Sequence, residues 1–250
     1  MHVNVEEIDG HYLAPGVIER TLLYSHQTGS GDLTVQHHTL PRGEITFLQE
    51  GVEYQHYVIS GCALMKGRLL HGDTGVFVPG SSRFGEPHEH VIAHMGEGDM
   101  RILTVIYSIP HPNFRWSKTR IKNLGQVKGS FGGMYAQQLF TEEEHALMGS
   151  LRMHSLDIQT HAPGVVLSTH RNPEEFAYIL RGNGEVTSGK DLVNVRPGSL
   201  VYTEEGVPHS VRNSSKVYPL QYVAFEFTRQ DQSWTEMGHQ KKRNYDYATN

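Results

Sequence analysis

The residues best suited to chemistry lie in two short stretches of the second half of the chain. Residues 169–182 contain His170 and Glu175, and the Gly-Val-Pro-His sequence at 206–209 supplies a second imidazole. Imidazole and carboxylate groups are the usual protein ligands of divalent transition metals. A strand's length of hydrophobic residues and a turn separate the two stretches, so a small β-barrel would bring them together. The pattern predicts a metal site held by His170, Glu175 and His209.

Strand and turn signals indicate how these side chains would be positioned. Residues 163–170 and 175–180 are typical of two strands, joined by a turn at Asn172-Pro173. Side chains alternate between the two faces of a strand, so a hairpin of this length sets His170 and Glu175 across from each other with both pointing inward. The stretch from residue 198 to 209 is typical of a strand, a tight turn and a second strand. The expected site therefore lies inside a β-structure.

The sequence contains two β-rich regions that match each other at an offset of 121 residues. The repeat holds without a gap through the central motif, and the turns that follow differ in length. Two copies of one β-unit indicate a repeated architecture, and closing each copy removes the exposed edges that many short strands leave. The matched positions are Gly43 and Gly164, Tyr57 and Tyr178, Gly61 and Gly182, and the Gly-x-Pro-His of 85–88 and 206–209, with Gly75 paired to Gly198 at an offset of 123.

Short β-type runs with glycine and proline turns favour an all-β protein of two tandem domains with one or two short helices. The expected boundaries are an N-terminal domain at 1–112, a linker at 113–133, a C-terminal domain at 134–235 and a polar tail at 236–250. The linker is basic, and the sequence Thr141-Glu142-Glu143-Glu144 has the form of a capping box at the start of a short helix.

The composition describes a globular protein with a formal net charge of −5, which argues against a nucleic-acid partner. No apolar run is long enough to cross a membrane, and the N-terminus lacks the pattern of a signal peptide. The lone cysteine, Cys62, allows no internal disulfide, so a cytoplasmic location is expected. The 17 histidines raise the expectation of metal chemistry only modestly.

The two motifs resemble those of the cupin family. Its first motif, a glycine, two histidines one residue apart, a glutamate and a closing glycine, reads here as Gly164, His170, Asn172, Glu175 and Gly182. Its second motif reads here as Gly198, Gly206-Val207-Pro208-His209 and Asn213. The resemblance covers both copies and implies a bicupin, with two tandem cupin-type jelly-roll β-barrels.

Asn172 stands where the family usually carries its second histidine. It is expected to be a weak fourth ligand or to hold a bound water beside the metal. In an alignment without a gap, Thr169 and Arg171 would instead occupy the two ligand positions, and the site would fail. The gapped alignment, with His170, Glu175 and His209 as ligands, is preferred.

The resemblance implies a metal-dependent enzyme that acts on a small polar metabolite and binds one divalent ion per chain. Two histidines and one carboxylate favour Fe(II) and a dioxygenase-type oxidoreductase, in which Arg171, Tyr178 or Tyr202 would orient the substrate. The alternative is a Mn(II)- or Zn(II)-dependent isomerase or hydrolase, such as an aminohydrolase, in which Glu174 or Glu204 would shuttle protons. A non-catalytic protein that binds a small ligand or serves as a structural partner remains a third interpretation. Pairing into a homodimer is expected from the family alone.

The first copy is poor in metal ligands. Gln49, Gly51 and Tyr54 replace His170, Asn172 and Glu175 there, and only His88 is retained. His56 and His90 could form a different site with His88, of a kind that suits zinc. A scaffolding role for this copy is the favoured interpretation.

Overall fold

The computed structural model describes residues 1–31, 33–48, 52–79, 89–108, 119–129, 134–140 and 154–227. These residues fold almost entirely into β-strands, and the helical elements among them are three single 3-10 turns, η1 (Val5–Glu7), η2 (Ser25–Gln27) and η3 (Leu124–Gln126). Within the same ranges no helix has the length and apolarity to cross a membrane. The expected all-β class is confirmed.

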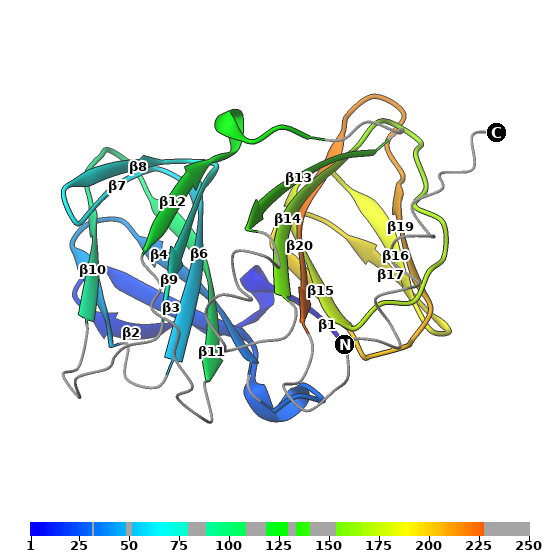
Figure 1. Ribbon diagram of the computed structural model, residues 1–250, viewed down its shortest axis with the longest axis horizontal. Coiled ribbons are helices and arrows are strands. Elements are labelled where there is room, and N and C mark those ends of the chain that lie inside the picture. Colours follow the sequence, from blue (N-terminus) through cyan, green and yellow to red (C-terminus); the bar gives the residue numbers. More distant parts are fainter. Residues whose placement is uncertain are drawn as a thin grey trace. The chain divides into compact units, whose positions relative to one another are not determined.

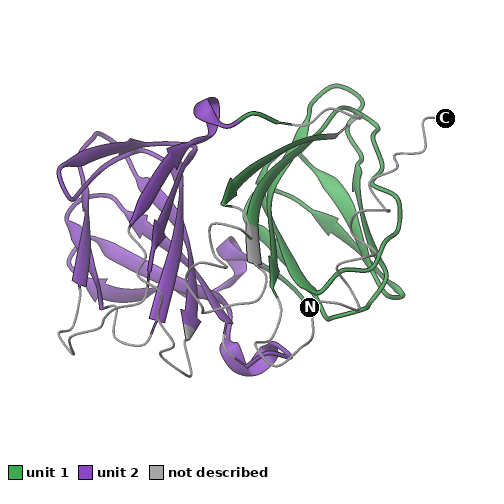
Figure 2. Cartoon of the chain, viewed as in Figure 1, with its two compact units in different colours: residues 1–3, 128–146, 151–250 green, residues 4–127, 147–150 purple. Residues whose placement is uncertain are grey.

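The chain divides into two compact units, each of which is shown in its own colour in Figure 2. Among the described residues, the N-terminal unit comprises 4–127, and the C-terminal unit combines 1–3 with 128–140 and 154–227. The predicted helix at 141–148 and the polar tail lie outside the described residues. So do Arg115 and Lys118 of the basic segment.

The N-terminal unit is built from two sheets (Figure 1). The seven-stranded sheet has the order β12-β9-β6-β11-β4-β3-β2, and the four-stranded sheet has the order β5-β10-β7-β8. The strand bounds are β2 His11–Ala14, β3 Val17–Leu23, β4 Leu33–Leu40, β5 Glu44–Leu48, β6 Val52–Ser60, β7 Cys62–Met65, β8 Arg68–His71, β9 Thr74–Val78, β10 Glu89–His94, β11 Met100–Ser108 and β12 Arg120–Asn123.

The C-terminal unit repeats this plan. Its six-stranded sheet has the order β1-β18-β15-β20-β14-β13, and its three-stranded sheet has the order β17-β16-β19. The strand bounds are β1 His2–Asn4, β13 Met134–Phe140, β14 His154–His161, β15 Glu174–Arg181, β16 Gly184–Ser188, β17 Asp191–Val195, β18 Ser199–Thr203, β19 His209–Asn213 and β20 Leu220–Phe227.

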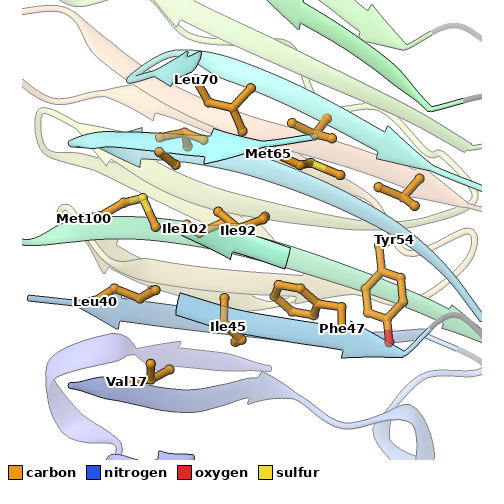
Figure 3. Packing of buried hydrophobic residues seen from close by; sticks show 14 residues of the cluster. Val17, Leu40, Ile45, Phe47, Tyr54, Met65, Leu70, Ile92, Met100 and Ile102 are labelled. Atoms are coloured by element: carbon orange, nitrogen blue, oxygen red, sulfur yellow. The ribbon is translucent and has the colours of Figure 1, made fainter. Parts of the chain in front are cut away.

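In each unit, apolar side chains fill the space enclosed by the strands. Figure 3 shows this core in the N-terminal unit, where Phe47 of β5 lies beside Tyr54 of β6. The corresponding core of the C-terminal unit is made of smaller side chains, among them Ala177 and Ala224. The difference in side-chain size bears directly on what each interior can hold.

The predicted repeat is visible in backbone geometry. Gly61 and Gly182, which the offset of 121 matches, both follow a strand and have φ angles of 87° and 80°. Residues with a side chain rarely adopt this left-handed backbone conformation. A Cβ at position 61 would also collide with Met100, and a Cβ at position 182 would collide with the carbonyl of Pro219. The steric need for glycine explains why both copies carry it.

One predicted match is shifted in the structure. Gly198 donates its backbone N–H to Ile179 just before β18, and the equivalent bond in the N-terminal unit runs from Asp73 to Val58. Asp73 also has a positive φ of 64°. The counterpart of Gly198 is therefore Asp73, while Gly75 lies inside β9.

Part of the segment expected as a linker is a strand. β12 pairs antiparallel with β9 at the edge of the seven-stranded sheet, and the division between the two units falls between Val127 and Lys128. At the other end of the chain, Met1 exchanges backbone hydrogen bonds with Tyr202 of β18, which ties the first residues to the C-terminal unit.

Candidate metal centre

The structure brings His170, Glu175 and His209 together in the C-terminal unit. One ligand atom from each lies within 4.8 Å of the others. His170 and His209 form an isolated antiparallel bridge, in which each backbone N–H donates to the carbonyl of the other at 3.0 and 2.9 Å. Glu175 is the second residue of β15 and turns toward the same point. The predicted cluster thus forms from three separate backbone segments. The expected hairpin was wrong, because residues 163–170 make only isolated bridges to β19, while β15 pairs with β18 and β20.

Both imidazoles are held in the orientation that a metal ligand needs. Nδ1 of His170 donates to the carbonyl of Ser168 at 2.9 Å, and Nδ1 of His209 donates to the carbonyl of Val207 at the same distance. A carbonyl oxygen can only accept, so the proton of each neutral ring sits on Nδ1 and the lone pair is on Nε2. This is the outer hydrogen bond that typically fixes the tautomer of metal-binding histidines. Nε2 of His209 points at the Glu175 carboxylate, 3.1 Å from Oε2.

Glu175 and His209 stabilise each other's charged form. Burial alone would raise the pKa of the Glu175 carboxyl, but the hydrogen bond and charge of His209, helped by Asn172, bring that pKa below its usual value. Burial likewise opposes protonation of His209, yet the hydrogen bond and charge of Glu175 raise the pKa of its imidazole. Without a metal, the pairing therefore favours a protonated His209 beside an ionised carboxylate, and a divalent cation would compete with that proton for Nε2.

Asn172 and Arg171 contact the site through hydrogen bonds. The Asn172 amide donates from Nδ2 to Oε2 of Glu175 at 2.8 Å, so it orients the carboxylate. Arg171 is exposed and donates from Nη1 to the carbonyl of Gly206, and Gly206 donates its backbone N–H to the carbonyl of Asn172 at 3.0 Å. These contacts join the turn before β15 to the loop before His209.

Glu174 and Tyr178 are placed away from the cluster. Alternation along β15 puts both on the face opposite Glu175. Oε2 of Glu174 accepts a hydrogen bond from the Tyr202 hydroxyl at 2.7 Å, and both groups are buried. The predicted proton-shuttling role of Glu174 and the substrate-orienting roles of Tyr178 and Tyr202 find no support in this placement. Glu204, the other predicted shuttle, is exposed.

A second buried carboxylate, which the sequence interpretation did not include, lies beside the cluster. Glu226 of β20 is the cross-strand partner of Glu175 and is 3% exposed. Cross-strand partners share a face of the sheet, so both carboxylates point inward, and the charge of Glu226 contributes to the raised pKa of His209. Alternation in residues 220–227 predicts a polar inward position, but only the strand register identifies its neighbour as Glu175.

The equivalent position in the N-terminal unit carries no ligand. Tyr54 occupies the place of Glu175, and its hydroxyl donates to the carbonyl of Leu48. The register of β6 and β11 puts Ile106 in the place of Glu226. Gln49, Gly51 and His88 lie outside the described residues.

His56 and His90, the other candidates in this unit, are bonded to each other. Their Nε2 atoms are 2.8 Å apart, and Nδ1 of His56 is 3.0 Å from the Thr104 hydroxyl. The same hydroxyl is 3.2 Å from Nδ1 of His38, whose Nε2 donates to Glu19 at 3.3 Å. With one proton on each ring, every bond in this chain has a donor and an acceptor. Such a network accounts for both imidazoles as structural groups in the barrel interior.

Comparison with known proteins supports the family resemblance. Residues 156–226 match the family model described as Cupin domain. The C-terminal unit is a cupin domain. The model matches the part of the chain that contains the candidate metal centre, and the register of β6, β9 and β11 shows that the N-terminal unit has the same architecture. Two tandem cupin-type jelly-roll barrels therefore make up the protein.

Solved structures share the two-barrel cupin fold at low sequence identity. Protein Ylba from E. coli is 15% identical with a TM-score of 0.71, over 93% of this chain and 92% of that chain. The putative glyoxylate induced protein from Pseudomonas aeruginosa is 14% identical with a TM-score of 0.70, over 90% and 84%. Oxalate decarboxylase from Bacillus subtilis, described with Mn(II) centres, is 15% identical with a TM-score of 0.68, over 93% and 78%. Comparison with curated protein sequences gives no match.

Proposed function

We propose that the C-terminal cupin barrel is the active site of a metal-dependent enzyme that acts on a small polar metabolite. His170, Glu175 and His209 hold one divalent ion per chain. The observation that carries the proposal is the pair of Nδ1 bonds to the carbonyls of Ser168 and Val207, because they leave both Nε2 lone pairs available for a metal.

The donor set fits a catalytic ion. Three protein ligands leave coordination positions open, whereas structural sites are usually filled by four. Two imidazoles and one carboxylate form the set found in non-haem Fe(II) oxygenases, and nitrogen and oxygen donors also suit Mn(II). When bound, such an ion supplies Lewis acidity or a place for dioxygen.

The chain's own residues prepare the site for that ion. Asn172 holds the carboxylate of Glu175 in place, and the bridge between His170 and His209 fixes the spacing of the two rings. Because Glu175 is buried and ionised, it supplies a negative charge where water screens it poorly, which strengthens the attraction for a cation.

Two reaction classes follow from the choice of metal. The ligand set favours an Fe(II)-dependent dioxygenase. The likeness of the fold to an oxalate decarboxylase with Mn(II) centres favours a Mn(II)-dependent lyase, isomerase or hydrolase as the second candidate.

Metal analysis together with oxygen uptake tests the proposal. The full chain is purified without added metal, and iron, manganese and zinc are measured in the wild type and in His170→Ala. His71→Ala, which alters an exposed histidine of β8, is the matched control. We expect about one ion per chain in the wild type and in the control, and a loss in His170→Ala. Equal metal content in all three proteins would refute the site. Oxygen consumption by the iron form with a substrate panel separates the oxygenase from the second candidate.

A further inference from the structure

Two hydroxyl side chains, Thr203 and Ser188, lie beside two of the proposed metal ligands. Thr203 of β18 is the cross-strand partner of Glu175. Ser188, the last residue of β16, is the cross-strand partner of His209. Cross-strand partners share a face of the sheet, and their Cβ atoms are about 4.5–5.5 Å apart. Both hydroxyls are therefore neighbours of the metal centre.

Alternation along the two strands places both side chains in the interior of the barrel. Val201 and Val186 belong to the apolar core of the C-terminal unit. Each of these valines lies two residues before one of the hydroxyls, so Thr203 and Ser188 point into the same interior. Thr203 is 4% exposed.

The two hydroxyls are bonded to each other across the barrel. Oγ1 of Thr203 donates to Oγ of Ser188 at 3.1 Å. Thr203 belongs to the six-stranded sheet and Ser188 to the three-stranded sheet, so this bond joins the two sheets beside the metal centre. A hydroxyl carries one proton to donate. Because Ser188 accepts in this bond, its own proton remains to be donated, and no described residue accepts it.

The N-terminal unit carries an apolar residue where Thr203 stands. Tyr54 replaces Glu175 in that unit, and its cross-strand partner on β9 is Val78. Val78 is fully buried in the apolar core. Valine and threonine have nearly the same shape, so packing alone does not require threonine at position 203. A buried hydroxyl costs free energy unless it is hydrogen-bonded. Its presence beside the ligands, where the other unit has valine, indicates a role at the metal centre.

We propose that Ser188 donates a hydrogen bond to a substrate oxygen that is bound to the metal ion, and that Thr203 positions the Ser188 hydroxyl for this bond. The substrate is then a small molecule that binds the ion through a carboxylate, carbonyl or ionised hydroxyl oxygen, because each of these accepts a hydrogen bond while it coordinates. A charged oxygen forms the strongest such bond. This inference rests on the proposed metal centre and names the chemistry of the substrate that it takes.

Two small probes that bind the Co(II)-loaded full chain test the inference. Co(II) binds nitrogen and oxygen ligands more tightly than Fe(II) or Mn(II) does, and its visible absorption spectrum reports a change of ligand. Acetohydroxamate chelates a metal through two oxygens, one of them ionised, whereas imidazole binds through nitrogen and places no acceptor at the ion. We expect Ser188→Ala to weaken acetohydroxamate by roughly tenfold to a hundredfold, the usual loss of a hydrogen bond to a charged group, and to leave imidazole unchanged.

Variants of two threonines separate positioning from packing. Thr203→Val should weaken acetohydroxamate by roughly twofold to tenfold, because the Ser188 hydroxyl loses the bond that orients it. Thr203→Ser keeps that bond and should match the wild type. Thr187→Val alters the outward-facing neighbour of Ser188 on β16 and is the matched control, with both affinities unchanged.

The metal content of each protein makes every outcome decisive. Equal affinity of the wild type and Ser188→Ala for acetohydroxamate overturns the inference while the metal centre stands. An equal loss of both probes in Ser188→Ala, or a wild type that holds cobalt and binds only imidazole, overturns it as well. Loss of cobalt from Ser188→Ala makes the hydroxyl a support for the ligands and also overturns it. A wild type that binds no cobalt removes the proposed function and this inference together.

Discussion

The N-terminal unit should lose stability in mild acid because of its buried histidines. Burial, with the charges of His38, Arg101 and Arg20, lowers the pKa of His37 to about 3. Burial, with the charge of Lys66, lowers the pKa of His90 to about 3. Both rings are therefore neutral in the folded chain, whereas in the unfolded chain they titrate near the ordinary value of about 6.5.

The sign and size of the effect follow from these values. As the pH falls below about 6.5, the unfolded chain takes up protons that the folded chain excludes, so the stabilisation is complete at higher pH and is lost toward pH 3. At pH 5 each ring lowers the free energy of unfolding by about 2 kcal/mol, and His37 and His90 together lower it by about 4 kcal/mol. The free energy of unfolding of a typical domain is about 5–15 kcal/mol, so the loss should be easy to measure. His56, whose pKa burial lowers well below 6.5, adds to it.

Urea unfolding followed by hydrogen exchange and mass spectrometry measures this loss in each unit separately. Peptides from β6 and β11 should lose protection between pH 7 and pH 5. The double variant His37→Gln/His90→Gln should show about 4 kcal/mol less pH dependence over that interval, and His71→Gln, at an exposed position, should match the wild type. An unchanged pH dependence in the double variant would refute the assignment of neutral buried rings.

Three more substitutions test individual contacts. Asn172→Ala should weaken metal binding by roughly 10- to 100-fold without abolishing it, because the amide orients Glu175 and does not replace it; metal titration checks this, and abolished binding would make Asn172 a ligand. Ala177→Leu should destabilise the C-terminal unit by about 1–3 kcal/mol, because the longer side chain overpacks the interior next to the ligands; urea unfolding measures the loss, and unchanged stability would contradict this packing. Thr104→Val should destabilise the N-terminal unit by about 1–3 kcal/mol for each histidine left without its partner, as measured by urea unfolding, and a neutral effect would argue against the network.

The fold and the three metal ligands were within reach of sequence reasoning because local signals specify them. Gly61 and Gly182 mark the same turn in each copy, and the backbone there excludes any Cβ. The hairpin expected between residues 163–170 and 175–180 is not formed, since His170 pairs with His209 and β15 pairs with β18 and β20. The sequence indicated which three residues come together, but not the pairing that brings them together.

Positions that depend on strand register were not predictable in the same way. Glu226 is 51 residues from Glu175 in sequence and becomes its neighbour only because β20 pairs with β15. Alternation from Glu175 already places Glu174 and Tyr178 on the opposite face, and the Tyr202 hydroxyl bond to Glu174 confirms it. The match of Gly75 with Gly198 failed because Asp73 also adopts a positive φ, which aspartate tolerates better than most residues.

The roles of polar residues in the interior also depend on partners far along the chain. His56 and His90 were candidates for a zinc site, and the bonds that occupy them come from each other and from Thr104 on β11. The edge strand β12 was not predicted, because its four residues show no alternation of apolar and polar side chains. All four side chains are only partly buried. Tertiary pairing, rather than local preference, decides such positions.

The most direct test of the central claim is the stoichiometry of divalent metal in the full chain and in His209→Ala, after loading with Mn(II) or Fe(II) and removal of free ions. The account predicts about one ion per chain in the wild type, less than a tenth of that in His209→Ala, and wild-type content in His71→Ala. Metal bound equally by His209→Ala and the wild type, or no metal bound by the wild type, would contradict it.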